Sequence, residues 1–229
     1  MRLPGNNDNM KIRVKFARKE RVKYLGHLDI MRSFQRGFIR AGVKMIYSEG
    51  FSPHQKMNFA QPLGVGVTSR GDYLDAEVMD GQDTKAIQDS LDAQMGEGFD
   101  VMSVRVINEG AAKGMAAVKY ASYEVEVTHG PVPDAGRFMN AGSVVAVKKT
   151  KSGESETDIR PLVLKMETAG NIFRFTVKGG SENNLKPDLL MQEIYRLNGM
   201  EYDRNNVHIE RMELMAEGFV PLESYQTAK

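Results

Sequence analysis

The residue types that could do chemistry gather between positions 24 and 66 of the chain. His27 and His54 are two of its four histidines, and Lys56 follows the second of them closely. Two histidines can act as general acid and base on RNA without a metal, and a lysine can stabilise the charge of the transition state. No third group that would orient either ring is evident, and capping or packing at a helix start for His27 and plain solvation for His54 are simpler explanations. The pattern therefore favours a non-catalytic protein, with a metal-independent endoribonuclease as the alternative.

Three arginines at four-residue spacing form a second feature of the same region. Apolar periodicity predicts a helix over residues 28–41, around which the arginines drift by only about 40° per step and form one stripe. Guanidinium groups match pairs of phosphate oxygens, so the stripe is compatible with a grip on phosphates as well as with an ordinary solvated face. The stripe consists of Arg32, Arg36 and Arg40, and the predicted apolar face consists of Leu28, Met31, Phe34, Phe38 and Ala41.

Aromatic side chains accompany these basic ones. Tyr24 precedes the predicted helix, and Phe51 lies in a loop that Gly50 and Pro53 keep irregular. Nucleic-acid bases stack on aromatic rings, although packing of Phe51 beneath its own loop is equally compatible with the sequence. The predicted nucleic-acid-binding residues are Tyr24, Arg32, Arg36, Arg40, Phe51, His54 and Lys56.

Charge is placed unevenly along the chain. The whole sequence has a net charge of only +1, yet residues 11–56 carry 12 basic and 3 acidic residues, a net of +9. Residues 57–229 carry 18 basic and 26 acidic residues, a net of −8. Such a split indicates that one end of the molecule meets an anionic partner, and RNA is the predicted one.

Composition excludes several classes of protein. The sequence has no cysteine, which rules out disulfides, thiolate catalysis, and zinc or iron–sulfur sites held by cysteine. Histidines at 27, 54, 129 and 208 show no metal-ligand spacing, so neither a metal nor another cofactor is predicted. No run of 18 apolar residues is present and residues 1–10 lack the apolar core of a signal peptide, so no membrane contact and a cytoplasmic location are predicted.

The elements that must position these residues alternate in a regular order. Residues 11–19 read as a strand with a basic outer face, followed by the helix over 28–41, strands over 43–47 and 72–79, a helix through residue 95 and a strand over 99–107. Strand–helix–strand–strand–helix–strand is the order of a ferredoxin-like (βαββαβ) unit, whose helices cover one sheet face and leave the other free to bind.

Residues 120–215 repeat that order with an extra hairpin, and one of the strands predicted there covers residues 157–166. The sequence therefore predicts an α+β protein of two tandem ferredoxin-like units with antiparallel sheets. Its predicted parts are a disordered leader (1–10), a basic domain (11–107), a linker (108–119), a second domain (120–215) and a flexible tail (216–229).

Several blocks of the first half resemble a known bacterial family. They are YLGHLD at 24–29, Arg32, RAG at 40–42, YSEGFSPH at 47–54, Lys56 and PLGVG at 62–66, and DIRPL at 158–162 resembles a further block. The likeness is to the radical-SAM-linked bacterial domain of unknown function, in its standalone form, and covers most of residues 11–215. It implies a partner that is a radical SAM protein, since this chain has no cysteine to hold that enzyme's cluster. The first half is also distantly similar to the CRISPR repeat-processing endoribonucleases, which implies RNA.

These observations together predict an RNA-binding accessory protein, with tRNA or rRNA as its ligand, linked to a radical SAM system that modifies RNA or serves the ribosome. Two alternatives remain at the level of sequence. One is the endoribonuclease with His27 and His54, and the other is an interaction module that binds a radical SAM enzyme without touching RNA.

Overall fold

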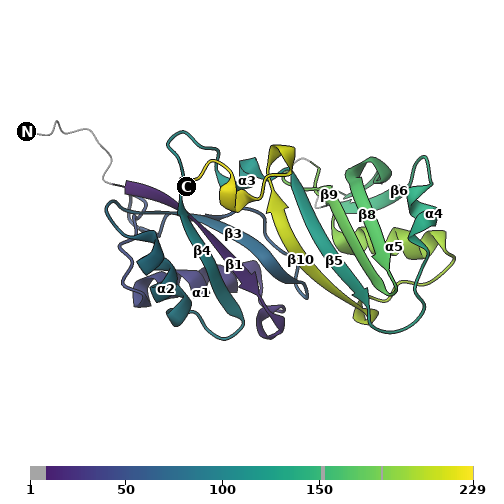
Figure 1. Ribbon diagram of the computed structural model, residues 1–229, viewed down its shortest axis with the longest axis horizontal. Coiled ribbons are helices and arrows are strands. Elements are labelled where there is room, and N and C mark those ends of the chain that lie inside the picture. Colours follow the sequence, from purple (N-terminus) through teal and green to yellow (C-terminus); the bar gives the residue numbers. More distant parts are fainter. Residues whose placement is uncertain (1–8, 151–152, 182, 229) are drawn as a thin grey trace, which may run out of the picture.

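The first half of the protein forms a sheet with two helices on one face (Figure 1). The computed structural model describes residues 9–150, 153–181 and 183–228. The elements of this half are β1 (Asn9–Arg18), α1 (His27–Arg40), β2 (Met57–Phe59), β3 (Thr68–Met79), α2 (Thr84–Gln94) and β4 (Phe99–Val106). Ile12, Val14 and Phe16 point from β1 to Phe34 and Leu91 on the helices, as the alternation along β1 predicts.

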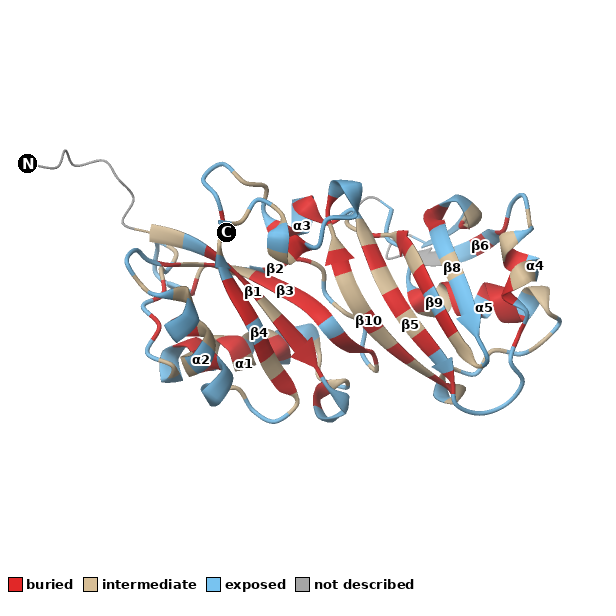
Figure 2. Cartoon of the chain, in the orientation of Figure 1, coloured by how far each residue is buried: buried red, intermediate tan, exposed pale blue. Residues whose placement is uncertain are grey.

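The second half continues the same sheet. Its elements are α3 (Gly114–Ala117), β5 (Tyr120–Val127), α4 (Ala135–Met139), β6 (Val145–Thr150), β7 (Gly153–Asp158), β8 (Val163–Ala169), β9 (Ile172–Lys178), α5 (Pro187–Leu197) and β10 (Val207–Met215). Phe138 on α4 and Leu190 and Ile194 on α5 pack with Val125 and Phe173 of the sheet. Bands of buried residues alternate with less buried ones along β5, β9 and β10 (Figure 2).

One eight-stranded sheet therefore runs through both halves. Its order is β4-β1-β3-β10-β5-β9-β8, with β2 paired to β3, and β6 and β7 form a separate two-stranded sheet. All strand pairs are antiparallel except β3 with β10, which pair in parallel through Thr68 and Ser69 against Glu210 and Arg211. The predicted α+β class with antiparallel sheets is confirmed in this coarser form, as a large and mostly antiparallel sheet.

Two local predictions differ from the structure. The sequence predicts a strand over residues 43–47, but Met45 and Tyr47 form only isolated bridges. The strand between α1 and β3 is instead β2, some ten residues later, which pairs with β3. The predicted strand over 157–166 is interrupted by a 3-10 turn, Arg160–Leu162, that separates β7 from β8. Proline at position 161 removes a backbone donor, which explains the break.

The C-terminal segment, residues 216–228, packs on the first half, whereas the sequence indicated a flexible tail. Leu222 is fully buried, and the Arg13 guanidinium on β1 donates to the carbonyls of Leu222 (3.0 Å) and Tyr225 (3.1 Å). Thr227 also bridges to Ile107. The sheet face that was predicted to be free for binding is therefore partly covered. Arg13 and Lys15 of the predicted basic outer face of β1 are engaged there, while Lys11 remains exposed.

The predicted linker is also more ordered than expected. Residues 108–119 contain α3, and Ala117 and Val118 are buried. Asp75 on β3 accepts a hydrogen bond of 2.7 Å from the Gly114 amide, which fixes the segment on the sheet. Residues 1–8 of the predicted leader lie outside the described residues. Residues 9 and 10, the last two of the predicted leader, belong to β1. Across the described ranges, no helix combines the length and apolarity of a membrane span.

Candidate functional site

The arginine stripe lies on the exposed side of α1. Ile30, Phe34 and Phe38 turn inward, while all three arginines face solvent, as the four-residue spacing predicts. Leu28 and Ile39 are also exposed, at 59% and 63%, so Leu28 does not belong to the buried face predicted for it. The helix therefore presents a mixed basic and apolar surface.

The three arginines are held to different degrees. Arg32 lies 3.5 Å from Asp29, a pair in which both side chains are more than half exposed. Arg40 donates to the Gln94 carbonyl at 2.6 Å and so ties α1 to the end of α2. Arg36 has no hydrogen-bond or ion-pair partner within the described part of the chain. Because exposed pairs contribute little, Arg32 and Arg36 remain available to an external anion.

Residues 47–56 form a loop, here called the 47–56 loop, whose base is fixed and whose tip projects. Ser48 donates its amide to the His54 carbonyl (2.8 Å), and the His54 amide donates to the Ser48 hydroxyl (3.1 Å). The Gln55 side chain donates to the Gln35 carbonyl on α1 at 3.1 Å. Phe51, at the tip, is fully exposed. The alternative that Phe51 packs beneath its loop is therefore wrong.

The other predicted aromatic, Tyr24, lies before α1 and is 71% exposed, with the Lys23 ammonium 5.2 Å from its ring centroid. The neighbouring turn reaches the second half, because the Gly66 amide donates to the Lys23 carbonyl (2.7 Å) and Arg204 donates to the Gly66 carbonyl (2.7 Å). Gly66 has φ +83°, a conformation that favours glycine.

The two histidines have different surroundings. The His27 ring packs edge-on against Phe59, with centroids 5.1 Å apart. The His54 Nδ1 lies 2.8 Å from the Ser48 hydroxyl. Within the described residues, no hydrogen bond joins the His27 and His54 rings. Phe59, against which His27 packs, belongs to the core on the helix side of the sheet. This arrangement gives no support to an acid–base pair.

His54 and Lys56 instead line a cavity of about 320 Å³, here called the lysine cavity. Gln55, between them, also belongs to the lining, and its side-chain amide donates to the Gln35 carbonyl on α1. The cavity also receives Lys11 from β1 and Lys113 from the segment before α3. Sequence reasoning missed Lys113, which lies 57 positions from Lys56 with no local signal that joins them. Asn58, Asp75 and Glu77 complete the polar lining.

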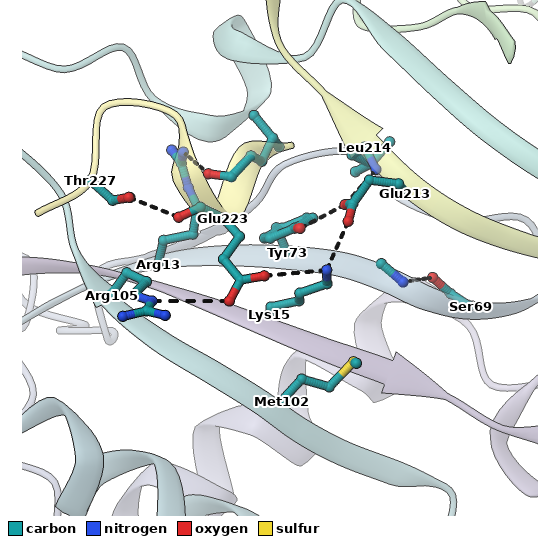
Figure 3. Close-up of polar contacts among 12 residues, drawn as sticks. Arg13, Lys15, Ser69, Tyr73, Met102, Arg105, Glu213, Leu214, Glu223 and Thr227 are labelled. Carbon is teal, nitrogen blue, oxygen red and sulfur yellow. Dashed lines mark hydrogen bonds and ion pairs between the residues drawn. The ribbon is translucent and has the colours of Figure 1, made fainter. Parts of the chain in front are cut away.

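A partly buried cluster of polar side chains joins β1, β3, β10 and the C-terminal segment, and sequence reasoning did not find it (Figure 3). Lys15 pairs with Glu213 at 2.7 Å and with Glu223 at 3.3 Å, and the Tyr73 hydroxyl donates to Glu213 at 2.6 Å. Burial and the adjacent Glu213 carboxylate raise the pKa of Tyr73 far above its usual value, so the hydroxyl remains a donor. Lys15, which the sequence placed on an open basic face, is thus neutralised within the protein.

A second buried ion pair lies where β3 and β10 meet. Asp72 accepts from the Arg211 Nε at 2.9 Å and from the Ser69 hydroxyl at 2.7 Å, and Arg211 also donates to the Gln61 carbonyl at 3.0 Å. Burial lowers the pKa of the adjacent Arg18 guanidinium, and Arg211 adds to that effect, while Asp72 opposes it. These residues connect the two halves, so we assign them a structural role.

The 158–162 block ties loops together. The Asp158 carboxylate accepts from the amides of Val144 (2.9 Å) and Arg160 (3.0 Å), which hold its pKa below the usual range. The Arg160 side chain donates to the carbonyls of Met139 (3.0 Å) and Val163 (3.2 Å). These contacts give the block a structural role. The described ranges contain no group of three or more potential metal ligands.

Comparisons with known proteins place the chain in a family. No curated protein sequence matches it. The crystal structure of an unknown protein from Galdieria sulphuraria aligns at 15% sequence identity, and the alignment covers 89% of this chain and 97% of the Galdieria chain. The TM-score is 0.29, which is too low to support an argument about fold. A family profile described as uncharacterized protein conserved in bacteria (DUF2344) matches residues 11–187. Since that match spans more than half of the sequence, the chain belongs to this family of uncharacterized bacterial proteins.

Proposed function

We propose that this protein binds RNA, without catalysis, through the arginine stripe of α1 and the tip of the 47–56 loop. The observation that carries the proposal is the contrast within the basic first segment. Arg13, Lys15 and Arg18 are buried or paired inside the protein, whereas Arg32 is loosely paired and Arg36 has no partner in the described residues. Exposed guanidinium groups at four-residue spacing suit a phosphate backbone.

The exposed aromatic rings complete this surface. Phe51 is fully exposed and Tyr24 is 71% exposed, and bases of single-stranded RNA stack on such rings. We further propose that each half is a ferredoxin-like unit. Its support is that both halves have the strand order fourth–first–third–second, as β4-β1-β3-β2 and β10-β5-β9-β8. The proposed setting is the cytoplasm, with tRNA or rRNA as the ligand.

The test is a fluorescence-anisotropy titration of labelled tRNA and of a single-stranded rRNA fragment. Arg32→Ala/Arg36→Ala removes two phosphate contacts, so we expect binding to weaken at least about tenfold and the dependence on salt to become less steep by roughly two units of slope. Lys165→Ala/Arg174→Ala is the matched control, since it removes two exposed positive charges from β8 and β9. Binding that neither salt nor the stripe variant weakens would contradict the proposal.

A second candidate function is docking to a radical SAM protein. The observation that favours it is the apolar part of the same helix surface, where the side chains of Leu28 and Ile39 are exposed beside the arginines. Leu28→Ser/Ile39→Ser would then abolish recovery of the radical SAM protein in a pull-down and leave RNA affinity unchanged. The endoribonuclease alternative has less support, because His27 and His54 contact different partners.

A further inference from the structure

The lysine cavity lies on the opposite sheet face from the arginine stripe. Along β1 and β3 the residues Ile12 and Ala76 pack toward the helices, so Lys11, Asp75 and Glu77 turn to the other face. The cavity is thus a second feature, distinct from the surface of the proposed RNA grip. The 47–56 loop contributes to both, through Phe51 at its tip and through His54 and Lys56 in the cavity wall.

The charges in the lysine cavity leave it positive. Asp75 receives a two-pronged ion pair from Arg13 (2.8 and 2.9 Å) and a hydrogen bond from the Gly114 amide (2.7 Å), so its negative charge is matched within the protein. Glu77 accepts from Asn9 at 3.0 Å and lies 3.5 Å from Lys56. Lys11, Lys56 and Lys113 therefore bring three positive charges to the lining, against the carboxylate of Glu77, which no arginine in the described part of the chain neutralises.

The histidine in the wall lies beside a serine hydroxyl. The Ser48 hydroxyl oxygen accepts the His54 amide (3.1 Å) and lies 2.8 Å from the His54 Nδ1. When that hydroxyl donates to Nδ1, the ring proton of a neutral His54 is on Nε2, where it can be donated to a ligand. Asn58 offers a side-chain amide in the same lining. The cavity thus combines lysine ammonium groups with neutral side chains that can donate hydrogen bonds.

We propose that the lysine cavity binds the phosphate group of a nucleotide-sized ligand. Ammonium groups recognise phosphate as point charges, and the side chains of His54 and Asn58 add directional hydrogen bonds. Its volume of about 320 Å³ is at the lower end of the roughly 300–1,000 Å³ of small-molecule sites, the range in which a mononucleotide falls. The phosphate belongs to a free mononucleotide or to the phosphorylated end of an RNA strand.

The first test is calorimetric titration of the full-length protein with AMP, and with adenosine as the uncharged counterpart. We expect AMP to bind and adenosine to bind at least about tenfold more weakly, a difference of roughly 1.4 kcal/mol. Lys56→Ala/Lys113→Ala should lower the affinity for AMP by a similar factor, and Lys44→Ala/Lys165→Ala, which removes two exposed lysines elsewhere, should not. His54→Ala, judged beside a circular dichroism check of folding, should weaken AMP binding on its own.

Equal affinity for AMP and adenosine, an unchanged affinity in Lys56→Ala/Lys113→Ala, or no saturable AMP binding would overturn the proposal.

Short RNA strands with a 5′-phosphate, a 3′-phosphate or only hydroxyl ends then identify the source of the phosphate. Preference for one phosphorylated end assigns the cavity to a strand terminus, and indifference to the ends with retained AMP binding assigns it to a free nucleotide. Arg32→Ala/Arg36→Ala should retain AMP binding, which separates this result from that of the stripe.

Discussion

At the scale of single residues, Lys15 is held between Glu213 on β10 and Glu223 in the C-terminal segment. Burial alone would raise the pKa of Glu223, but the nearby Ser103 hydroxyl and the Lys15 ammonium outweigh it and lower that pKa below 4.5. Burial alone would lower the pKa of Lys15, but Glu213 and Glu223 raise it above 10.5. Each group therefore stabilises the charged form of the other.

The two shifts predict how stability depends on pH. The contribution of Glu223 is complete above its unfolded pKa of about 4.5 and is lost as the pH falls through its lower folded pKa. The contribution of Lys15 is complete below about 10.5 and is lost as the pH rises through its higher folded pKa. Between these limits we expect Glu223→Gln to reduce the free energy of unfolding by about 1 kcal/mol.

Urea denaturation at several pH values checks this expectation. The difference between the natural protein and Glu223→Gln should shrink when the pH falls well below 4.5, because the natural carboxylate is then protonated too. Glu109→Gln, at an exposed position, serves as the control that should be neutral throughout. A difference between the two proteins that stays constant from neutral to strongly acidic pH would count against the role assigned to Glu223.

At the scale of elements, the junction of β3 and β10 depends on a close approach of two backbones. A Cβ added at Gly71 would lie 2.5 Å from the Met212 carbonyl oxygen and 2.8 Å from the Glu213 Cα. Both are backbone atoms, so one strand must shift to accept the methyl group. The same strands carry Asp72 and Arg211, whose buried ion pair would be displaced with them.

We therefore expect Gly71→Ala to reduce the free energy of unfolding by about 1–3 kcal/mol, the usual cost of forced overpacking. Gly96→Ala is the matched control, since a Cβ there meets no atom within 4 Å. Chemical denaturation of both variants gives the comparison. Equal stability of the two would show that the strands separate without cost at this point.

Elements with local signals were predicted well from the sequence. The apolar periodicity that predicts α1 is contained within a few neighbouring residues. The alternation of β1 likewise predicted its inward face. The candidate site was predicted in part for the same reason, because the spacing of the arginines alone fixes their common face on α1.

The remainder depends on contacts between distant residues. Asp72 and Arg211 are 139 positions apart, and Lys15 and Glu213 are 198 apart, so no local pattern links them. For this reason the sequence indicated a free basic face on β1 and a flexible tail, where the structure has neutralised cations and a packed segment. The lysine cavity was missed likewise, since Lys113 reaches it from a segment that the sequence marked as a linker.

At the scale of the whole molecule, the two halves share one sheet and one buried ion pair. We therefore expect the protein to unfold in a single transition by differential scanning calorimetry, with equal calorimetric and van't Hoff enthalpies. A fragment that ends at Ile107 would lose the carbonyl partners of Arg13 and expose the β3 edge that β10 covers. This fragment should melt at a lower temperature than the intact chain, or remain unfolded. Two well-separated transitions of the intact chain would instead indicate independent domains.

The contact between Arg13 and Leu222 also has a consequence for biosynthesis. The two residues are 209 positions apart, so the ribosome needs roughly 10–40 s to make the second after the first, at about 5–20 residues per second. For most of that interval β1 lies outside the ribosome while its cover has not been translated. The nascent first half is thus an open substrate for chaperones, and synonymous codons that slow translation after residue 107 would prolong that exposure without changing the finished protein.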